Sequence, residues 1–471
     1  MNLVRRDRAA LGAAFSFALL MLALAAVRAQ EKANNDAKQK AQEPAELTIA
    51  LDPTFGNGGF VAVLLDAKTQ TGALGRFLAV DRQGRPMIAG NSPGQRFAVG
   101  RYTQQGRPDT TFAGKGKTSI CIEDDATVEA AAGTEVQFTH GGAIDAKGRL
   151  VVIGKGAGIG GERKWDFALL RFAPDGTLDK TFGEVGYRKY QAHESWNIGL
   201  AVATAPDCST LVAAGYAQTN TLNDPLLIRF SEAGVLDEAF SAAANGSLRW
   251  LVKDGTPATA TGVAIDPQGR YLVGMNIHKD DITKWALARL KNDGEFDETF
   301  GERGLWCEML DPDAPEEATF STVIDAAGRI VMGGYSADGS GLRRLAVARI
   351  NERGQSDASF GSDGKGHIIF DGYGATVGYR YGPRATVSKN RIAITGSVNG
   401  AKDNIKCFGV AVMDESGKSV AKFEPRLFPG SKGTDQPWGV AFDGEGCIVV
   451  GGASQAISNK WRFAVARYIV K

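Results

Sequence analysis

After residue 46 the chain is a succession of short stretches in which apolar and polar residues alternate or run apolar, each ending at a polar or glycine-containing turn. One such stretch is Gly262–Ile265, which ends at the turn Asp266–Gly269. Another is the alternating stretch Phe97–Tyr102. A period of two residues bounded by Gly and Asp is typical of strands and hairpins, and no helical stripe follows residue 46. The pattern predicts an all-β fold.

The stretches recur at a period of about 60 residues, each repeat containing four predicted strands. An Asp-x-x-Phe element, often preceded by Leu and followed by Gly, marks each period and is predicted to be the fourth strand. It is found at Leu51–Gly56, Pro108–Phe112, Leu178–Gly183, Leu236–Phe240, Phe296–Gly301 and Ser356–Gly361. Such units bury their apolar faces against neighbouring units rather than in a private core.

Counting the anchors of the strands predicts how the repeats close. Third strands are anchored at Arg101, Arg171, Arg229, Arg289, Arg349, Val412 and Arg467, which define repeats one to seven. Fourth strands are anchored at Asp52, Asp109, Asp179, Asp237, Asp297, Asp357 and Val420. The two sets match only if the strand at the N-terminus completes the last repeat. We therefore expect a seven-bladed β-propeller with four antiparallel strands per blade, closed in this way.

An arginine and an aspartate lie at a constant offset of eight residues in repeats one to five, as in Arg101 and Asp109. A constant offset across a hairpin predicts an ion pair, although each side chain could instead bond the backbone separately. Arg467 has no aspartate at this offset, and we expect Asp52 to pair with it as a bidentate latch. In repeat six Val412 and Val420 replace both members, as expected if an apolar pair fills a buried ion-pair site.

The repeat resembles that of the delta-60 repeat family of bacterial exported proteins. The family unit reads approximately Phe-Ala-Leu-Ala-Arg-Tyr, then Asp-Gly-Ser-Leu-Asp-x-x-Phe-Gly, and residues Phe167–Gly183 follow it almost throughout. The resemblance extends over nearly all of residues 50–471, and repeat six departs from it most. It implies a propeller in an envelope or extracellular setting, and it implies nothing about catalysis.

The first 29 residues have the pattern of a signal peptide, with Arg5, Arg6 and Arg8 before an apolar run from Leu11 to Val27. The alternative is an uncleaved anchor. Residues 30–45 are predicted to be a polar disordered lead-in, and residues 46–471 the propeller domain. We expect a periplasmic or secreted protein with no stable membrane insertion after cleavage.

Charge and cysteine content narrow the class of partner. Cleavage of the predicted signal peptide removes Arg5, Arg6, Arg8, Arg28 and Asp7, which changes the formal net charge from +1 to −2. Such near-neutrality argues against nucleic acid as a partner. The five cysteines have no C-x-x-C spacing, and an odd count scattered through the repeats favours free buried thiols.

Candidate binding residues lie in the connections between strands. Connections between strands two and three, and from strand four to the next repeat, are dissimilar, and such variable loops on one propeller face are typical of a binding surface. Trp165, Trp285 and Trp461 recur there at one register and could stack on sugar rings or grip a peptide, or pack between blades. His278, Asp280 and Asp281 could bind an ion or exchange a proton, or form a solvated loop. The four histidines have no metal-ligand spacing, so neither metal nor cofactor is predicted.

Two functional classes fit these features. The first is a non-catalytic binding propeller that recognises an envelope protein or a polysaccharide through its variable-loop face, and the scarcity of histidine favours it. The second is a propeller hydrolase or lyase that acts at the central mouth. Since propellers support both classes, the fold cannot decide between them.

Overall fold

The computed structural model describes residues 28, 30, 32, 47–65, 72–92, 96–122, 137–157, 165–192, 196–219, 222–240, 247–249, 256–279, 282–376, 382–400 and 405–471. Residues Leu47–Lys471 form one compact unit. The predicted signal peptide and polar lead-in lie outside the described residues, apart from Arg28, Gln30 and Lys32. Within the described part of the chain, no helix is long and apolar enough to cross a membrane.

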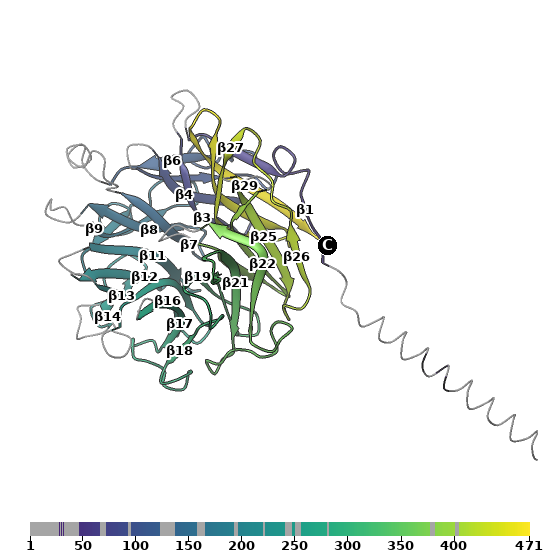
Figure 1. Ribbon diagram of the computed structural model, residues 1–471. Coiled ribbons are helices and arrows are strands. Elements are labelled where there is room, and N and C mark those ends of the chain that lie inside the picture. The colour runs from purple at the N-terminus through teal and green to yellow at the C-terminus, as the bar shows by residue number, and fades with distance from the viewer. Residues whose placement is uncertain are drawn as a thin grey trace, which may run out of the picture. The chain divides into compact units, whose positions relative to one another are not determined.

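Every element with defined bounds is a β-strand, and the sheets lie side by side around a common centre (Figure 1), so the prediction of an all-β propeller is confirmed. Repeats one to four contain β3 (Leu74–Val80), β4 (Pro86–Ser92), β5 (Arg96–Arg101), β6 (Lys117–Ile120); β7 (Phe138–Ile144), β8 (Leu150–Ala157), β9 (Trp165–Phe172), β10 (Tyr187–Tyr190); β11 (Trp196–Thr204), β12 (Thr210–Thr219), β13 (Leu222–Ser231), β14 (Ser247–Arg249); β15 (Ala258–Ile265), β16 (Tyr271–Lys279), β17 (Ile282–Leu290) and β18 (Leu305–Glu308). Repeats five to seven contain β19 (Glu317–Ile324), β20 (Ile330–Ala337), β21 (Arg343–Ile350), β22 (His367–Thr376); β23 (Arg384–Ser388), β24 (Arg391–Asn399), β25 (Lys406–Asp414), β26 (Val420–Phe423); β27 (Ser431–Phe442), β28 (Ile448–Ala456) and β29 (Trp461–Val470). The chain begins with β1 (Ile49–Leu51) and β2 (Phe60–Val63).

Strand pairing divides the described residues into five sheets, not the seven expected. Repeats one to four each form a separate four-stranded sheet. The strands of repeats five, six and seven, together with β1 and β2, belong to one thirteen-stranded sheet. The merger has a local cause, because the far end of β22 pairs with β24, and Lys406 of β25 pairs with Thr434 of β27 in parallel.

The N-terminal strands complete the sheet of the last repeat, as the sequence predicts. β2 pairs antiparallel with β29, with Phe60 opposite Ala466 and Val63 opposite Phe463. β1 continues along the same strand, with Leu51 opposite Tyr468. The exposed edge that β29 would otherwise present is therefore covered by the other end of the chain.

The Asp-x-x-Phe elements are turns, so their assignment as fourth strands is wrong. In repeat two the amide of Phe182 donates to the carbonyl of Asp179, and Gly183 follows with φ of 59°. The fourth strand, β10, begins only at Tyr187. A residue with positive φ cannot continue an extended strand, which explains why the motif ends in glycine in most repeats.

Apolar side chains pack between neighbouring repeats. One cluster combines Ile153 and Phe167 of repeat two with Val202 and Ile228 of repeat three. Another combines Phe408 of repeat six with Phe60 and other residues of the last sheet. Each repeat therefore depends on its neighbours for burial of its apolar surface, as expected of a repeat protein.

All five cysteines are free. Cys208 and Cys407 are buried, and Cys121 and Cys447 are half-buried. Cys307 is exposed, so the expectation that the thiols are buried is wrong for this residue.

Candidate functional site

The two faces of the ring differ in their connections. We call the face with the turns between strands one and two, and between strands three and four, the turn face. The first of these turns spans residues 81–85, 145–149, 205–209, 266–270, 325–329, 389–390 and 443–447, so it has five residues in all but one case. The opposite face, the variable-loop face, has connections between strands two and three at 93–95, 158–164, 220–221, 280–281, 338–342, 400–405 and 457–460. The asymmetry predicted from the sequence is therefore present.

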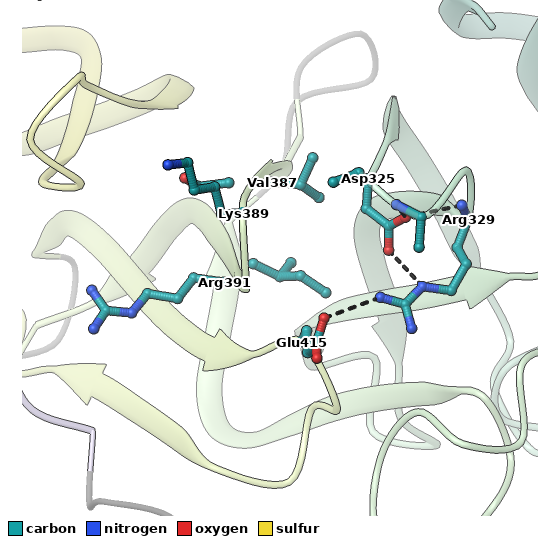
Figure 2. A pocket seen from close by; sticks show the side chains of 10 residues that line it. Asp325, Arg329, Val387, Lys389, Arg391 and Glu415 are labelled. Carbon is teal, nitrogen blue, oxygen red and sulfur yellow. Dashed lines mark hydrogen bonds and ion pairs between the residues drawn. The ribbon is translucent and has the colours of Figure 1, made fainter. Parts of the chain in front are cut away.

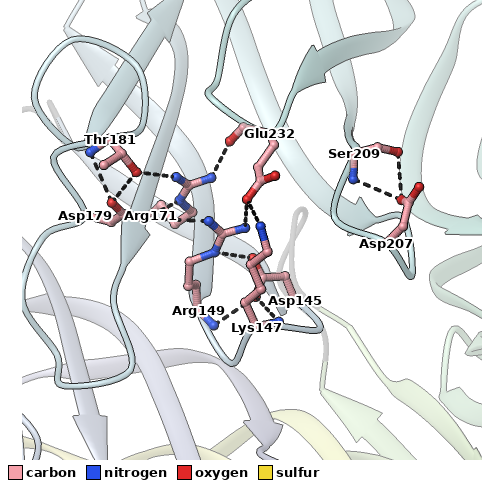
Figure 3. A network of polar contacts seen from close by, with 9 residues as sticks. All are labelled: Asp145, Lys147, Arg149, Arg171, Asp179, Thr181, Asp207, Ser209 and Glu232. Carbon is pink, nitrogen blue, oxygen red and sulfur yellow. Dashed lines mark hydrogen bonds and ion pairs between the residues drawn. The ribbon is translucent and has the colours of Figure 1, made fainter.

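The predicted arginine–aspartate pairs form on the turn face. In each of repeats one to five the arginine Nε donates to the aspartate Oδ2, at 2.7 Å for Arg101–Asp109 and Arg171–Asp179, 2.8 Å for Arg229–Asp237 and Arg349–Asp357, and 2.9 Å for Arg289–Asp297. The arginine also donates to a backbone carbonyl, so the ion pair and the backbone contact that were considered for the constant offset are both present. Figure 3 shows one such group with Arg171, Asp179 and Thr181.

These arginines link adjacent repeats. Arg289 Nη1 donates to the carbonyl of Glu352 in the next repeat at 2.6 Å, and its guanidinium lies 4.5 Å from the centroid of the Phe300 ring. The residue after Phe300, Gly301, donates its amide to the carbonyl of Arg353 at 2.7 Å. Equivalent carbonyl contacts are made by Arg101, Arg171, Arg229 and Arg349, to Pro174, Glu232, Asn292 and Glu415. The most repeated motif of the sequence thus holds the ring together.

The two ends of the chain meet in a variant of this contact. Arg467 Nη1 donates to Asp52 Oδ2 at 2.6 Å, which confirms the predicted pairing. The contact is not bidentate, because Nε of Arg467 donates to Asp443 at 2.8 Å and Nη2 contacts Asp443 and Glu445. Burial raises the pKa of Asp52, but hydrogen bonds from Thr54 and the charge of Arg467 outweigh burial and lower it overall. The guanidinium is therefore shared among three carboxylates.

The same carboxylates form the one group of potential metal ligands found among the described residues. Ligand atoms of Asp443, Glu445 and Cys447 lie within 4.8 Å of one another. Asp443 and Glu445 both bind Arg467 instead, and burial raises the pKa of the Cys447 thiol to about 11. A group whose carboxylates already neutralise a buried cation is better explained by closure of the ring than by metal binding.

Repeat six lacks the arginine contact altogether. Val412 is fully buried, but Val420 is 38% exposed and lies in β26 opposite Met413. The expectation that two valines replace the ion pair in one buried site is therefore wrong for Val420. Repeat six has no Asp-x-x-Phe turn, because its hairpin leads directly from β25 into β26.

The three predicted tryptophans have different environments. Trp285 is fully buried, and its Nε1 donates to the carbonyl of Tyr335 at 3.4 Å, so it packs between repeats four and five. Trp461 is half-buried at the start of β29. Trp165 is also half-buried, with Lys155 Nζ 3.2 Å from the centroid of its ring. Of the three, only Trp165 joins the cluster described below.

The predicted histidine site is only partly described. His278 is half-buried, and its Nδ1 lies 3.0 Å from the Thr283 hydroxyl. Burial lowers the pKa of His278, with Glu316 acting in the opposite direction. Asp280 and Asp281 lie outside the described residues, so the predicted association of the three side chains is untested.

Sequence reasoning missed a set of residues on the first strands of the repeats. These strands contact one another in the cyclic order β27, β3, β7, β11, β15, β19, β23 and back to β27, and so surround the centre. A shift in pairing register leaves one residue of the strand unpaired in six of them. These bulge residues are Arg76, His140, Leu200, Thr261, Phe320 and Trp438, and all are buried. Bulges commonly redirect a side chain next to a functional site.

The bulge residues bring cations and aromatic rings together at the centre. The Arg76 guanidinium lies 4.1 Å from the Trp438 ring centroid and 4.6 Å from that of Phe138. The His140 ring is 5.1 Å from the Phe138 ring. Arg384, at the start of β23, donates from Nη2 to the carbonyl of His140 at 3.3 Å, across 244 residues of sequence. Residues from four different repeats therefore meet here.

The cluster continues toward the variable-loop face. Lys155 Nζ lies 5.6 Å from the Phe138 ring centroid and close to Trp165, as described above. The Trp165 ring is 4.4 Å from the ring of Trp196, which is 37% exposed at the start of β11. A chain of cations and aromatic rings thus leads from Trp438 at the centre to Trp196 at the surface. We call Arg76, Phe138, His140, Lys155, Trp165, Trp196, Arg384 and Trp438 the central cluster.

Pockets on the turn face are weaker candidates. One of about 210 Å³ lies between repeats five and six and is lined by Asp325, Arg329, Val387 and Glu415 among others. Figure 2 shows Arg329 reaching toward Asp325 and Glu415, while Arg391 points away. A similar pocket of about 240 Å³ lies between repeats four and five. Their charged groups serve contacts between the repeats.

A sequence signal for the central cluster exists, although repeat comparison hides it. Each bulge residue stands five positions before the first residue of the following turn, as Arg76 does before Asp81 and Trp438 before Asp443. Three positions after the bulge, five of the six strands have alanine, whereas the bulge position itself carries a different residue in each strand. If the first strands of the repeats are aligned, the variation at this one position indicates which residues differ in function from the rest of the strand.

Comparison with protein families supports a β-propeller repeat family. A family described as "Domain of unknown function (DUF5122) beta-propeller" matches residues 148–182 and 328–360. Each matched segment leads from the end of the first turn through the second and third strands to the Asp-x-x-Phe turn, in repeats two and five. A comparison with curated proteins finds no match.

Solved structures with similar folds include two polysaccharide lyases. An ulvan lyase of family PL25 is 12% identical, with a TM-score of 0.49, and the alignment covers 83% of this chain and 94% of that one. The polysaccharide lyase Uly1 is 10% identical, with a TM-score of 0.48 and coverage of 84% and 89%. A protein of unknown function from Dyadobacter fermentans DSM 18053 is 11% identical, with a TM-score of 0.40 and coverage of 91% and 98%. At these identities and TM-scores the similarity says nothing of activity.

Proposed function

We propose that this protein is a non-catalytic binding propeller that recognises a protein or a polysaccharide of the bacterial envelope or exterior through its variable-loop face. The observation that carries the proposal is the different use of the two faces. On the turn face the repeated arginines and aspartates bind one another and adjacent repeats. Apolar side chains are exposed on both faces, and those of the variable-loop face lie on or next to connections that differ from repeat to repeat.

The exposed apolar side chains of the variable-loop face come from different repeats. Among the residues that the structure describes, they are Trp196 of repeat three, Ile282 of repeat four, Leu342 of repeat five and Ile457 of repeat seven. Ile457 is 74% exposed at the tip between β28 and β29. Apolar groups spread over several loops of one face are typical of a surface that contacts a large partner rather than a small molecule.

The proposal includes an architecture and a location. We propose that the thirteen-stranded sheet is three blades joined at their edges, which gives seven blades in all, since the first strands form a closed cycle of seven members. We also propose that the protein is a delta-60 repeat protein, exported by its N-terminal segment to the periplasm or the exterior. The Asp-x-x-Phe-Gly turns and the Arg5–Val27 pattern support these two statements.

A capture experiment with matched variants tests the binding proposal. The mature protein, Ile457→Ser with Leu342→Ser, and Val185→Ser with Val235→Ser would be immobilised and exposed to envelope extracts and to a glycan panel. All four positions are exposed, with the first pair on the variable-loop face and the second on the turn face. We expect the first pair of substitutions alone to reduce capture. Equal capture by all three proteins, or no ligand for any of them, would contradict the proposal.

The central cluster favours one alternative, a hydrolase or lyase that acts at the central mouth. His140 is the histidine of the central cluster, and Arg384 donates to its backbone carbonyl. A histidine can act as a general base, and guanidinium groups can stabilise developing negative charge. Shortening of acidic polysaccharides by the purified protein, abolished in His140→Ala, would favour the enzyme over the binding propeller.

A further inference from the structure

The charge of the central cluster indicates the chemistry of a ligand. Arg76 and Arg384 bring two guanidinium groups to the strands that surround the centre. Among the described residues of these first strands, the carboxylates are Glu317 and Asp435. Both carboxylates are held by their own repeats and are not directed to the arginines. With Lys432 of β27, the described first strands therefore carry three cationic side chains and two carboxylates, and both carboxylates are bound within their own repeats.

The carboxylates are held by similar contacts in two different repeats. Glu317 accepts hydrogen bonds from the amides of Leu310 and Asp311 at 2.8 and 2.9 Å, and from the Ser336 hydroxyl at 2.6 Å. Asp435 accepts from the amide of Phe428 at 2.9 Å and the Ser431 hydroxyl at 2.7 Å. Each therefore fixes the loop that enters its own first strand.

The aromatic part of the central cluster indicates a ligand with flat apolar surfaces. Trp196 is the most exposed of its rings, and the Trp165 ring packs against it with a distance of 4.4 Å between the ring centroids. Lys155 lies next to Trp165, so cation and ring alternate from the surface toward Arg76. The apolar faces of sugar rings stack on indoles, whereas their carboxylate or sulfate groups bind guanidinium groups in a planar geometry.

We infer that the variable-loop face binds an acidic polysaccharide, with anionic groups at Arg384 and Arg76 and a sugar ring on Trp196. The inference rests on the proposed binding function and specifies its ligand. An acidic polypeptide would satisfy the guanidinium groups, but its side chains would not provide flat rings between the charges. A neutral polysaccharide would stack on Trp196 but would offer no anionic group to the two guanidinium groups.

Calorimetric titration with matched polymers tests the inference. The mature protein would be titrated with polygalacturonate, with the same polymer after complete methyl esterification, with a sulfated polysaccharide and with polyglutamate. Polygalacturonate is expected to bind, more weakly as salt increases, because the contacts are electrostatic. The esterified polymer is expected to bind at least about tenfold more weakly because it loses hydrogen bonds between charged groups. Polyglutamate is expected to bind about tenfold more weakly because it has no sugar ring to stack on Trp196. Binding of the sulfated polymer alone would assign the anion as sulfate.

Variants assign the binding to the cluster. Arg384→Gln and Trp196→Ala are expected to weaken polygalacturonate binding about tenfold each, whereas Arg384→Lys retains part of it because the charge remains. Val235→Ala on the turn face serves as the control. Circular dichroism and unfolding curves equal to those of the parent would show that each variant is folded.

The outcomes separate this inference from the proposed function. Equal binding of the acid and the ester, equal binding of polyglutamate, unchanged binding by Arg384→Gln, or no binding of any acidic polymer would overturn the inference. Capture of a protein or neutral glycan through Ile457 and Leu342 in that case would leave the binding proposal intact. Failure of both experiments would overturn both.

Discussion

Arg467 and Asp52, 415 residues apart in sequence, form a buried ion pair with a distance of 2.6 Å between Nη1 and Oδ2. The pair joins the last long strand to the segment between β1 and β2. In repeats one to five the corresponding arginine finds its aspartate eight residues later in the same repeat. The closing contact thus uses the chemistry of the internal contacts with a partner from the other end of the chain.

Removal of the closing carboxylate should destabilise the ring. Asp52→Asn leaves Arg467 with Asp443 and Glu445, so we expect a loss of about 2 kcal/mol in the free energy of unfolding, less than for a buried charge left alone. Chemical denaturation measures it. Asp207→Asn serves as the control, because Asp207 is an exposed turn residue that bonds only Ser209 among the contacts described. An equal effect of the two substitutions would show that Asp52 acts only as a turn residue.

The arginines inside the repeats should not be replaceable by lysine. Arg289 donates to Asp297, to Thr299 and to the carbonyl of Glu352 in the next repeat. An ammonium group cannot reproduce this planar fork, and Arg289→Lys should lower the free energy of unfolding by about 2 kcal/mol. Arg96→Lys, at an exposed position, should change it little. If the two variants have the same unfolding midpoint, the role given to Arg289 is contradicted.

The close approach of adjacent repeats can be separated from backbone strain with two glycines. Gly234 and Gly269 have φ of 75° and 77°, so alanine is strained equally at both. A Cβ at Gly234 would lie 2.7 Å from the Phe182 ring of the preceding repeat. A Cβ at Gly269 would have no heavy atom of another residue within 4 Å, apart from its chain neighbours. Gly269→Ala should destabilise by about 1 kcal/mol, and Gly234→Ala by clearly more. Equal melting temperatures for the two variants would refute a close inter-repeat contact.

The paired aspartates predict how stability depends on pH. Burial raises the pKa values of Asp109, Asp179, Asp297 and Asp357, but hydrogen bonds from the following Thr or Ser and the paired arginine lower them overall. A lowered pKa stabilises the fold above the unfolded value of about 3.9, and this stabilisation is lost as pH falls through the folded value. The free energy of unfolding should therefore drop steeply below about pH 4.

Two carboxyl groups should act in the opposite direction. Burial raises the pKa values of Glu317 and Asp435, so the folded state binds their protons more tightly than the unfolded state does. Stability from these groups falls as pH rises through their folded pKa values. Asp109→Asn should flatten the acid limb of the stability profile, and Glu317→Gln should not. A profile that stays level in acid would contradict the assigned shifts.

The sequence predicted the contacts whose residues repeat. The offset between Arg171 and Asp179 was visible because the same geometry is used five times, and the pairing of Asp52 with Arg467 followed from the imbalance at the chain ends. The repetition of the Asp-x-x-Phe motif does not distinguish a turn from a strand, because it contains no information on the positive φ of Gly183. The last three repeats merge into one sheet through single pairings such as that of Lys406 with Thr434. The sequence pattern does not predict such single pairings.

The central cluster could not be predicted in the same way. Its members Arg76, His140 and Trp438 differ from one another because each repeat contributes once to a shared centre. A bulge also breaks the alternation that tells which side of a strand a residue faces. The tryptophans looked equivalent in sequence, but neighbouring repeats bury Trp285 completely and leave Trp165 half-buried.

Comparison of the chain that begins at residue 47 with one that begins at residue 66 tests the closure of the ring most directly. The shorter chain lacks β1 and β2 and leaves the edge of β29 uncovered. We predict that it unfolds at a lower denaturant concentration and elutes as a larger species in size-exclusion chromatography, because uncovered edges pair with other chains. The same unfolding midpoint and the same elution volume for both chains would contradict the account.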